Sequence, residues 1–342
     1  MNIVIVSDAW APQVNGVVRT LEAMTRELRD LGHRVEVIGP AEFPTMPMPS
    51  YPEIRLALLP YRRLTRRIEA MQPCAIHIAT EGPLGHAARR YCRRRGLPFT
   101  TAVHTLFPEY IHARIRLPVR VSYAYMRWFH RPATRVMVAT DTVEQQLHGR
   151  GFGRLTRWTR GVDTTLYRPR PDERDFLNLP RPIWLNVGRV AVEKNIDAFL
   201  SLDLPGSKLV VGDGPQRAAL QRRYPDAHFV GAKFGEDLAR HYAAADAFVF
   251  PSRTDTFGLV VLEALACGLP VAAYPVQGPR DLLEGSGVGV LDEDLGRAAR
   301  AALRIPREAC VEFADSRGWR RSAEQFLAAL APFETDWAAR SH

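Results

Sequence analysis

The sequence lacks any run of apolar residues long enough to cross a membrane. A transmembrane helix needs about 18 or more consecutive apolar residues, and the 342-residue chain contains no such run. The first residues, MNIVIVSDAW, form a short apolar segment without the basic flank or cleavage site of a secretion signal. We therefore expect a cytoplasmic protein.

Cysteine is also scarce. The four cysteines, Cys74, Cys92, Cys267 and Cys310, are far apart and form no C-x-x-C pair. This spacing argues against a disulfide framework and against a thiolate metal site. We interpret all four as reduced structural residues.

Lysine is the rarest charged residue, with Lys194, Lys208 and Lys233 the only three in the chain. Residues 1–170 contain 26 Arg, no Lys and 13 acidic residues, a net charge of +13, whereas the remainder carries −4. The basic half predicts an anionic partner, such as a membrane surface, an acidic ligand or RNA. With 46% hydrophobic residues, the chain has the size and composition of two globular domains.

Short apolar strands alternate with amphipathic helical patterns in the first half. The expected strands are 3–6, 35–38, 75–79, 99–103 and 135–139, with the first helix at about 16–31. Such alternation is typical of a parallel α/β sheet, in which ligands bind at the carboxyl ends of the strands. Residues 160–182 are rich in proline and charge and predict a linker, after which a strand at 183–187 begins a second alternation.

The stretch 247–273 reads as strand, polar turn, apolar helix from 257 to 267, and strand. Glu263 lies in that helix among apolar residues, where a carboxylate needs a hydrogen-bonding partner. Asp255, at the expected N-cap, lies beside the backbone amides of Phe257, Gly258 and Leu259, which attract anions and hydroxyls. Two readings stay open: a ligand site with a carboxylate at each end, or an ordinary cap with Glu263 paired to an arginine.

Further polar residues follow other strands at the same expected edge. In the second half Gly188, Arg189 and Lys194 follow the strand 183–187, and the two cations can neutralise a diphosphate. Gly212 follows the next strand, and Gly214 beyond it is more typical of a turn. Lys233 follows the third expected strand of the second half.

In the first half Gly16, after Asn15 at a helix start, can let backbone amides approach a phosphate. His104 ends the fifth strand, and either residue could instead be structural. Residues 110–135 interleave arginine with aromatic residues, which fits a surface helix or a membrane-binding patch. Asp292 and Asp294 match a D-x-D metal pattern, but they lie far from the other candidates, so we expect no metal.

These segments together resemble the retaining glycosyltransferases of family 4. The motifs are Asn15-Gly16, His104, RGVD at 160–163, GRVAVEKN at 188–195, VGDGP at 211–215 and TDTFGLVVLE at 254–263. They span nearly the whole chain in the family's order. The resemblance implies the GT-B fold, in which two Rossmann-like domains face each other across a cleft. We place the domains at 1–168, for the acceptor, and 169–318, for the nucleotide sugar, with a C-terminal helix in 319–342 that packs back on the first domain.

The resemblance also implies a role for each candidate. Asp255 would bind the donor sugar and Glu263 the nucleotide ribose. Arg189 and Lys194 would hold the diphosphate, Gly16 would close over it, and His104 would contact the sugar near the reacting carbon. The remaining donor-binding candidates are Gly188, Gly212, Lys233 and the amides of Phe257, Gly258 and Leu259; Asp255, Arg189, Lys194 and His104 are the catalytic set.

Three features depart from the family pattern. The first acid is Asp255 rather than Glu, Asn15-Gly16 replaces a Gly-Gly pair, and the helix after Lys194 is short. The TDTFGLV form and the arginine-rich first half look like the branch acting on lipid acceptors, including mannosyl-, glucosyl- and sulfoquinovosyl-diacylglycerol synthases.

The expected reaction is transfer of a hexose from GDP-mannose or a UDP-hexose to an acceptor hydroxyl, with the anomeric configuration retained. We expect no cofactor and no metal, because Arg189 and Lys194 can stabilise the leaving diphosphate. The expected acceptor is a membrane lipid such as diacylglycerol or a glycolipid, reached from the inner face of an anionic membrane. A GT-B sugar-nucleotide epimerase is the alternative enzyme, and an RNA-binding protein is the alternative outside enzymology.

Overall fold

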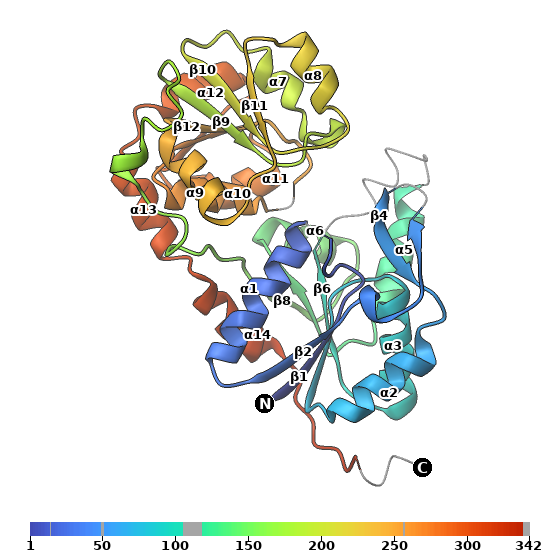
Figure 1. The fold of residues 1–342 in the computed structure, drawn as a ribbon. Helices are drawn as coiled ribbons and strands as arrows, with labels where there is room; N and C mark the ends of the chain where they lie inside the picture. The colour runs from blue at the N-terminus through green and yellow to red at the C-terminus, as the bar shows by residue number, and fades with distance from the viewer. Residues whose placement is uncertain (14, 49–50, 105–117, 256, 338–342) are drawn as a thin grey trace. The chain divides into compact units, whose positions relative to one another are not determined.

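The structure is a computed structural model that describes residues 1–13, 15–48, 51–104, 118–255 and 257–337, with only the backbone of 51–54. It divides into two compact units, one made of residues 1–160 and 319–342 and the other of residues 161–318. Each unit is built on a six-stranded parallel sheet (Figure 1). This confirms the expectation of two Rossmann-like domains.

The first sheet places β5 and β6 at its centre. Its strands, in spatial order, are β2 (Arg34–Ile38), β1 (Asn2–Val6), β5 (Ala75–Ile78), β6 (Thr100–Val103), β7 (Arg135–Val138) and β8 (Leu155–Arg157). Within the described residues, the helices of this unit are α1 (Gly16–Asp30), α2 (Tyr61–Met71), α3 (Pro83–Arg95), α5 (Val119–His130), α6 (Asp141–Gly149) and α14 (Trp319–Ala329), with the 3-10 turn η1 (Pro40–Glu42). A separate hairpin pairs β3 (Thr45–Met48) with β4 (Tyr51–Ala57).

Helices cover both faces of the first sheet because its strands are apolar on both sides. Alternate residues of β1 point to opposite faces: Val4 belongs to the core shared with α2 and α3, whereas Ile3 belongs to the core shared with α1 and α14. Phe326 of α14 is fully buried in this second core. The C-terminal helix therefore completes the first unit.

The second sheet repeats the arrangement. Its strands, in spatial order, are β11 (His228–Gly231), β10 (Ser207–Val211), β9 (Ile183–Val187), β12 (Ala247–Phe250), β13 (Val271–Ala273) and β14 (Gly289–Leu291). Its helices are α7 (Ile196–Leu200), α8 (Arg217–Arg223), α9 (Gly235–Ala244), α10 (Leu259–Ala266), α11 (Gln277–Leu283), α12 (Leu295–Ala302) and α13 (Arg307–Asp315), with the 3-10 turns η2 (Pro171–Glu173) and η3 (Val192–Lys194).

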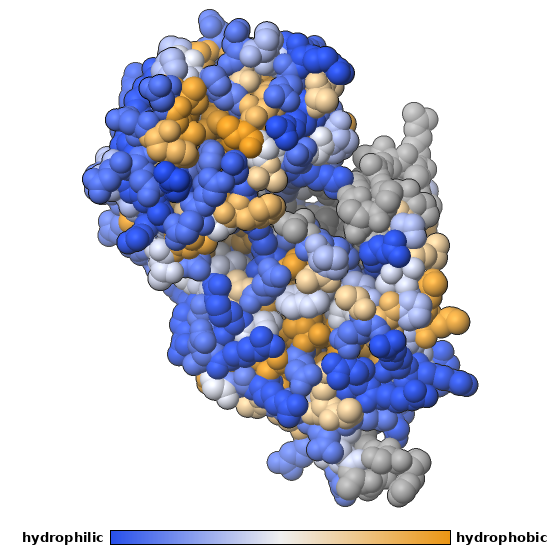
Figure 2. Space-filling view, viewed as in Figure 1, coloured by the Kyte–Doolittle hydropathy of each residue, from blue (hydrophilic) through white to orange (hydrophobic). Residues whose placement is uncertain are grey.

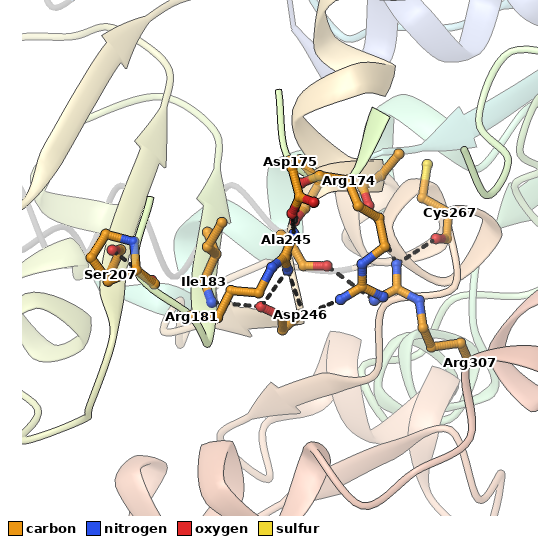
Figure 3. A network of polar contacts seen from close by, with 12 residues as sticks. Arg174, Asp175, Arg181, Ile183, Ser207, Ala245, Asp246, Cys267 and Arg307 are labelled. Carbon is orange, nitrogen blue, oxygen red and sulfur yellow. Dashed lines mark hydrogen bonds and ion pairs between the residues drawn. The ribbon is translucent and has the colours of Figure 1, made fainter. Parts of the chain in front are cut away.

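The segment expected to be a linker is tied to the second sheet through Asp246, just before β12. The Asp246 carboxylate accepts hydrogen bonds from Arg174 at 2.5 Å, from Arg181 at 2.8 Å and from the Ile183 amide at 2.8 Å. Figure 3 shows both guanidinium groups converging on this carboxylate, with Arg307 alongside. Because residues 161–182 pack on the second sheet, the unit boundary falls at 160/161 rather than at the expected 168.

None of the four cysteines forms a disulfide bond. Cys92, Cys267 and Cys310 are fully buried, and burial raises the pKa of Cys92 and of Cys310 to about 12. These thiols are protonated packing residues, as the sequence predicts.

Candidate active site

Lys194 and Asp255 lie in the loops that follow two neighbouring strands, β9 and β12. Because β9 and β12 are paired in parallel, both loops leave the same edge of the sheet. The Lys194 Nζ atom lies 2.5 Å from Asp255 Oδ1, and the two side chains are 28% and 20% exposed. The second oxygen, Asp255 Oδ2, is buried and accepts no hydrogen bond from the residues that the structure describes. One carboxylate oxygen thus meets a cation and the other lacks a donor.

Asp255 is not the N-cap of the following helix, which corrects the sequence prediction. Helix α10 begins at Leu259, two residues later than expected, and its N-cap is Gly258 with φ of +86°. This left-handed conformation suits glycine and delays the helix start. The Asp255 side chain is therefore available for its pairing with Lys194.

Glu263 is buried in α10 at 7% exposure, as the sequence predicts. Its Oε2 atom accepts a hydrogen bond from the hydroxyl of Tyr242 at 2.9 Å. Tyr242 belongs to α9 and is fully buried. The carboxylate therefore has a partner contributed by a neighbouring helix, which offsets part of its desolvation cost.

The loops after β9 and β10 pack backbone against backbone. A Cβ atom on Gly212 would lie only 1.8 Å from the carbonyl oxygen of Gly188, and one on Gly214 would lie 2.4 Å from the carbonyl oxygen of Val190. Both positions therefore require glycine for close approach, including Gly214, which the sequence reading treated as a turn residue.

The remaining predicted cations lie on loops at the same edge of the second sheet. Arg189 is exposed directly after Gly188, at the end of β9. Lys233 follows β11 and forms an ion pair with Asp237 at 3.0 Å. Arg189, Lys194 and Lys233 therefore follow strands of one sheet, and the donor-binding role of each stays a prediction.

Sequence reasoning missed the start of α11, which packs on the Asp255 loop. A Cβ atom on Gly278 would lie 2.5 Å from the carbonyl oxygen of Asp255 and 3.1 Å from the amide nitrogen of Phe257. The preceding side chain, Gln277, has a buried Nε2 atom with no hydrogen-bond acceptor within the described part of the chain. The signal was present in the sequence: Gln277-Gly278-Pro279 directly follows the strand β13 and its short turn.

His104 directly follows β6 in the first unit, and Arg160 donates a hydrogen bond to it. The Arg160 Nη2 atom donates to His104 Nδ1 at 3.2 Å, and the ring lies edge-on to Trp158. Burial, together with the charge of Arg160, holds the pKa of His104 well below its ordinary value. His104 is therefore neutral near pH 7, with Nδ1 as a hydrogen-bond acceptor.

Gly16 is the first residue of α1, as predicted, and is exposed. Asn15 is the N-cap, and its side chain accepts hydrogen bonds from the amides of Val17 and Val18 at 3.0 Å each. The Asn15 amide oxygen thus occupies two of the amides that a phosphate would use.

Asp8, in the loop after β1, is not among the candidate residues taken from the sequence. Its buried carboxylate accepts hydrogen bonds from the Thr80 hydroxyl at 2.9 Å and the Leu84 amide at 2.8 Å. Burial raises the pKa of Asp8. The side chain joins the loop after β1 to the start of α3 and is therefore part of the scaffold.

Both aspartates of the D-x-D segment accept hydrogen bonds from nearby residues of the chain. Arg297 donates to both oxygens of Asp292 at 2.6 and 2.7 Å, and Asp294 caps α12. Arg297 lowers the pKa of Asp292 to about 2. In the described part of the chain, no three His, Cys, Asp or Glu side chains group as metal ligands would.

Two family descriptions match the chain: Glycosyltransferase Family 4 over residues 14–166 and Glycosyl transferases group 1 over residues 181–307. A GDP-mannose-dependent alpha-mannosyltransferase of Mycobacterium tuberculosis is 33% identical over 315 residues, covering 85% of this chain and 83% of its own. The sulfoquinovosyl transferase SQD2 of Arabidopsis thaliana is 29% identical over 79% of this chain and 58% of its own. The alpha-monoglucosyldiacylglycerol synthase of Streptococcus pneumoniae is 25% identical over 89% of this chain and 78% of its own.

Solved structures share the fold. A sucrose-phosphate synthase of Thermosynechococcus elongatus superposes with a TM-score of 0.78 at 22% identity, covering 95% of this chain and 97% of its own. HepE of Anabaena, solved with UDP and glucose, superposes with a TM-score of 0.73 at 16% identity, covering 96% and 98%. The two parallel-sheet units, the order of the motifs and these matches agree, and the chain belongs to the retaining glycosyltransferases of family 4, with the GT-B fold.

Proposed function

We propose that this hexosyltransferase moves mannose from GDP-mannose to the hydroxyl of a membrane lipid, with a UDP-hexose as the alternative donor. The observation that supports a donor site is the Lys194 and Asp255 pair at the carboxyl edge of the second sheet. GDP-mannose is preferred because the mycobacterial relative, at 33% identity, is named for that donor.

In this proposal, Lys194 and Arg189 bind the diphosphate of the donor. Both follow β9, so their charges can act on the same anion. Asp255 binds a sugar hydroxyl, because its buried Oδ2 can accept a hydrogen bond that no described residue supplies. Glu263, held by Tyr242, binds the ribose hydroxyls. The amides of Phe257, Gly258 and Leu259, which lie at the start of α10, complete the sugar site.

The chemical step places negative charge on the departing diphosphate. A cation already positioned at that point stabilises the transition state more than the ground state, which is how a charged contact raises a rate. Lys194 serves this purpose in the proposal, and the leaving phosphate accepts the proton of the acceptor hydroxyl. His104, neutral and hydrogen-bonded through Nδ1 to Arg160, acts as a sugar contact rather than as an acid.

The lipid acceptor is supported by charge and by a relative. The first 170 residues carry a net charge of +13, and the streptococcal relative is named as an alpha-monoglucosyldiacylglycerol synthase. In this proposal, the arginine-rich segments 62–67 and 114–131 contact the membrane. Residues 62–67 lie in α2 with four arginines, and 118–131 include α5; residues 114–117 lie outside the described part. No helix in the described ranges is long and apolar enough to cross a bilayer.

An activity assay with every combination of three donors and three acceptors tests this function. Purified protein is incubated with GDP-mannose, UDP-glucose or UDP-galactose and with diacylglycerol in vesicles, a glycolipid in vesicles or a water-soluble alcohol. We expect an α-linked mannolipid from GDP-mannose, with little transfer to the soluble alcohol. Efficient transfer from a UDP-hexose alone would overturn the donor, equal use of the soluble alcohol would overturn the acceptor, and release of an epimerised nucleotide sugar without transfer would overturn both.

A further inference from the structure

A groove on the surface of the first unit is lined by α3 and α5 and plays no part in the donor site. Its volume is about 510 Å³, and it is open to solvent. The residues that line it are His86, Arg89, Arg90, Arg93, Arg94 and Trp128. Four of the six are arginine and none is acidic. A concave surface with this lining favours an anionic ligand.

Hydrogen bonds and a ring contact hold the floor of the groove in a defined position. Arg89 is buried at 6% exposure, and it donates from Nε to the carbonyl oxygen of Phe129 and from Nη2 to that of Trp128, each at 2.9 Å. These carbonyls lie in the last turn of α5, where the helix dipole favours a cation. The guanidinium carbon also lies 4.0 Å from the centre of the Trp128 ring. Arg89 and Trp128 therefore hold each other in place.

The rim carries three more arginines with restricted positions. Arg90 and Arg94 lie over the Tyr61 ring of α2, at 4.7 and 5.7 Å from its centre. Arg93 follows Arg89 by one helical turn, so the two like charges face the same side. Burial lowers the pKa of Arg89, and the charge of Arg93 lowers it further. Within the described ranges, no acidic side chain forms an ion pair with Arg90, Arg93 or Arg94.

We propose that this groove is a binding site for a phosphate ester. Planar guanidinium groups match phosphate oxygens in pairs, and an anion here would relieve the repulsion between Arg89 and Arg93. The ligand chemistry is shared by the head group of an anionic phospholipid and by a soluble phosphate ester. The proposal is independent of the donor site, because it rests on α2, α3 and α5 of the first unit.

An apolar surface lies beside the charges. Val121, Tyr125 and Trp128 are 53%, 43% and 49% exposed, and their spacing places them on one face of α5. Tyr125 also contacts the groove, since its hydroxyl lies 2.6 Å from His86 Nε2. In Figure 2 the surface over α2 and α3 is strongly hydrophilic. A ligand with a phosphate beside an apolar chain fits this combination.

The test uses the full chain with two probes. In the soluble arm, sn-glycerol 3-phosphate is titrated while the indole N–H resonance of Trp128 is followed by NMR; the resonance is assigned by its loss in Trp128→Phe. In the lipid arm, sedimentation is measured with phosphatidylcholine vesicles, with and without phosphatidic acid. The groove variant carries Arg90→Gln, Arg93→Gln and Arg94→Gln. The control carries Arg222→Gln, Arg304→Gln and Arg321→Gln, three exposed arginines outside the groove.

We expect saturable binding in at least one arm, weakened about a hundredfold in the groove variant and at most about twofold in the control. A response only with phosphatidic acid vesicles identifies a lipid head group as the source, and one only with glycerol phosphate identifies a soluble ester. No response in either arm would overturn the site. So would equal losses in the groove and control variants, because a diffuse field of charge would then explain the binding.

Discussion

Lys194 and Asp255 are the residues on which the proposed donor site depends most directly. Their ion pair joins loops that lie 61 residues apart in the chain, and each side chain keeps about a quarter of its surface exposed. Asp255 neutralises the ammonium when the diphosphate is absent. A bound donor would then exchange one anionic partner of Lys194 for another, so the site needs no large rearrangement of charge.

Replacing Lys194 by Ala should reduce kcat about a hundredfold or more. Loss of a charge-assisted contact to a leaving group costs roughly 2 to 4 kcal/mol of transition-state stabilisation. Glu263→Ala and Arg189→Ala should lose most activity as well, whereas Arg222→Ala, an exposed change in the same unit, should not. Transfer rates and thermal melting are measured together. A folded Lys194→Ala protein with wild-type turnover would remove Lys194 from the mechanism.

His77 makes the first unit sensitive to acid. The ring is fully buried between Trp158 and Phe326, and burial, with the charge of Arg160, lowers the pKa of His77 to about 3. In the unfolded chain this pKa returns to about 6.5. Between these values the unfolded state binds a proton that the folded state does not, so stability falls as the pH falls from about 6.5 and is unaffected above it.

Below pH 6, His77 should therefore lower the free energy of unfolding by about 1.4 kcal/mol for each unit by which the pH falls. Urea denaturation at pH 7, 6 and 5 measures the slope. His77→Gln should remove this dependence of the free energy of unfolding on pH, whatever the stability of the variant at pH 7. His148→Gln, at the exposed end of α6, should keep the dependence. An identical slope in wild type and His77→Gln would contradict the assignment.

At the scale of elements, the proposed donor site depends on how α11 packs against the loop between β12 and α10. Gly278 brings the two backbones together, since any side chain there would meet the Asp255 carbonyl group. The same close approach joins the loops after β9 and β10 through Gly212. Loops of irregular backbone are thus held in fixed positions by contacts with each other.

Gly278→Ala should raise the KM for the donor and lower the free energy of unfolding by about 1 to 3 kcal/mol, because the added methyl group must displace backbone atoms. Gly149→Ala is the matched control, since a Cβ atom at Gly149 would meet nothing within 4 Å. Steady-state kinetics and denaturant unfolding check both effects. If Gly278→Ala behaves like Gly149→Ala, the contact does not position the Asp255 loop.

At the scale of the molecule, the distribution of charge separates the tasks of the two units. The acidic carboxylates and scarce lysines of the donor site lie in the second unit, whereas the arginine excess lies in the first 170 residues. Each unit has its own core on both faces of its own sheet. In the proposed function, the second unit binds the nucleotide sugar and the first presents a basic surface.

Transfer activity should survive EDTA. The proposed partners of the diphosphate are Arg189 and Lys194, and Asp292 and Asp294 are engaged by Arg297 and by a helix cap. Initial rates are compared before and after chelation, followed by addition of Mg²⁺ or Mn²⁺. Abolition by EDTA with recovery on adding either ion would show that the reaction needs a metal.

Binding to anionic vesicles should weaken as salt rises. Each arginine near an anionic surface contributes about 1 kcal/mol at moderate ionic strength, and salt screens this attraction over a Debye length of about 10 Å at 0.1 M. Sedimentation with neutral and anionic vesicles at low and high salt measures the effect. Equal, negligible binding to both kinds of vesicle would refute a peripheral membrane location.

The sequence alone determined the alternation of strands and helices, the residues at the carboxyl ends of the strands, and the burial of Glu263. These follow from local patterns of polarity and from the covalent geometry of strands and helices. The family motifs added the fold and the reaction, and the comparisons confirmed the fold and the transfer of a sugar from a nucleotide sugar.

Only the tertiary structure decided which distant residues meet. It paired Lys194 with Asp255, supplied Tyr242 to Glu263, placed Gly278 against the Asp255 loop, and moved residues 161–168 into the second unit. The physical reason is that these contacts depend on strand order and on helix packing across the sheet. Periodicity reports which face of an element is buried, and it carries no information about which element covers that face.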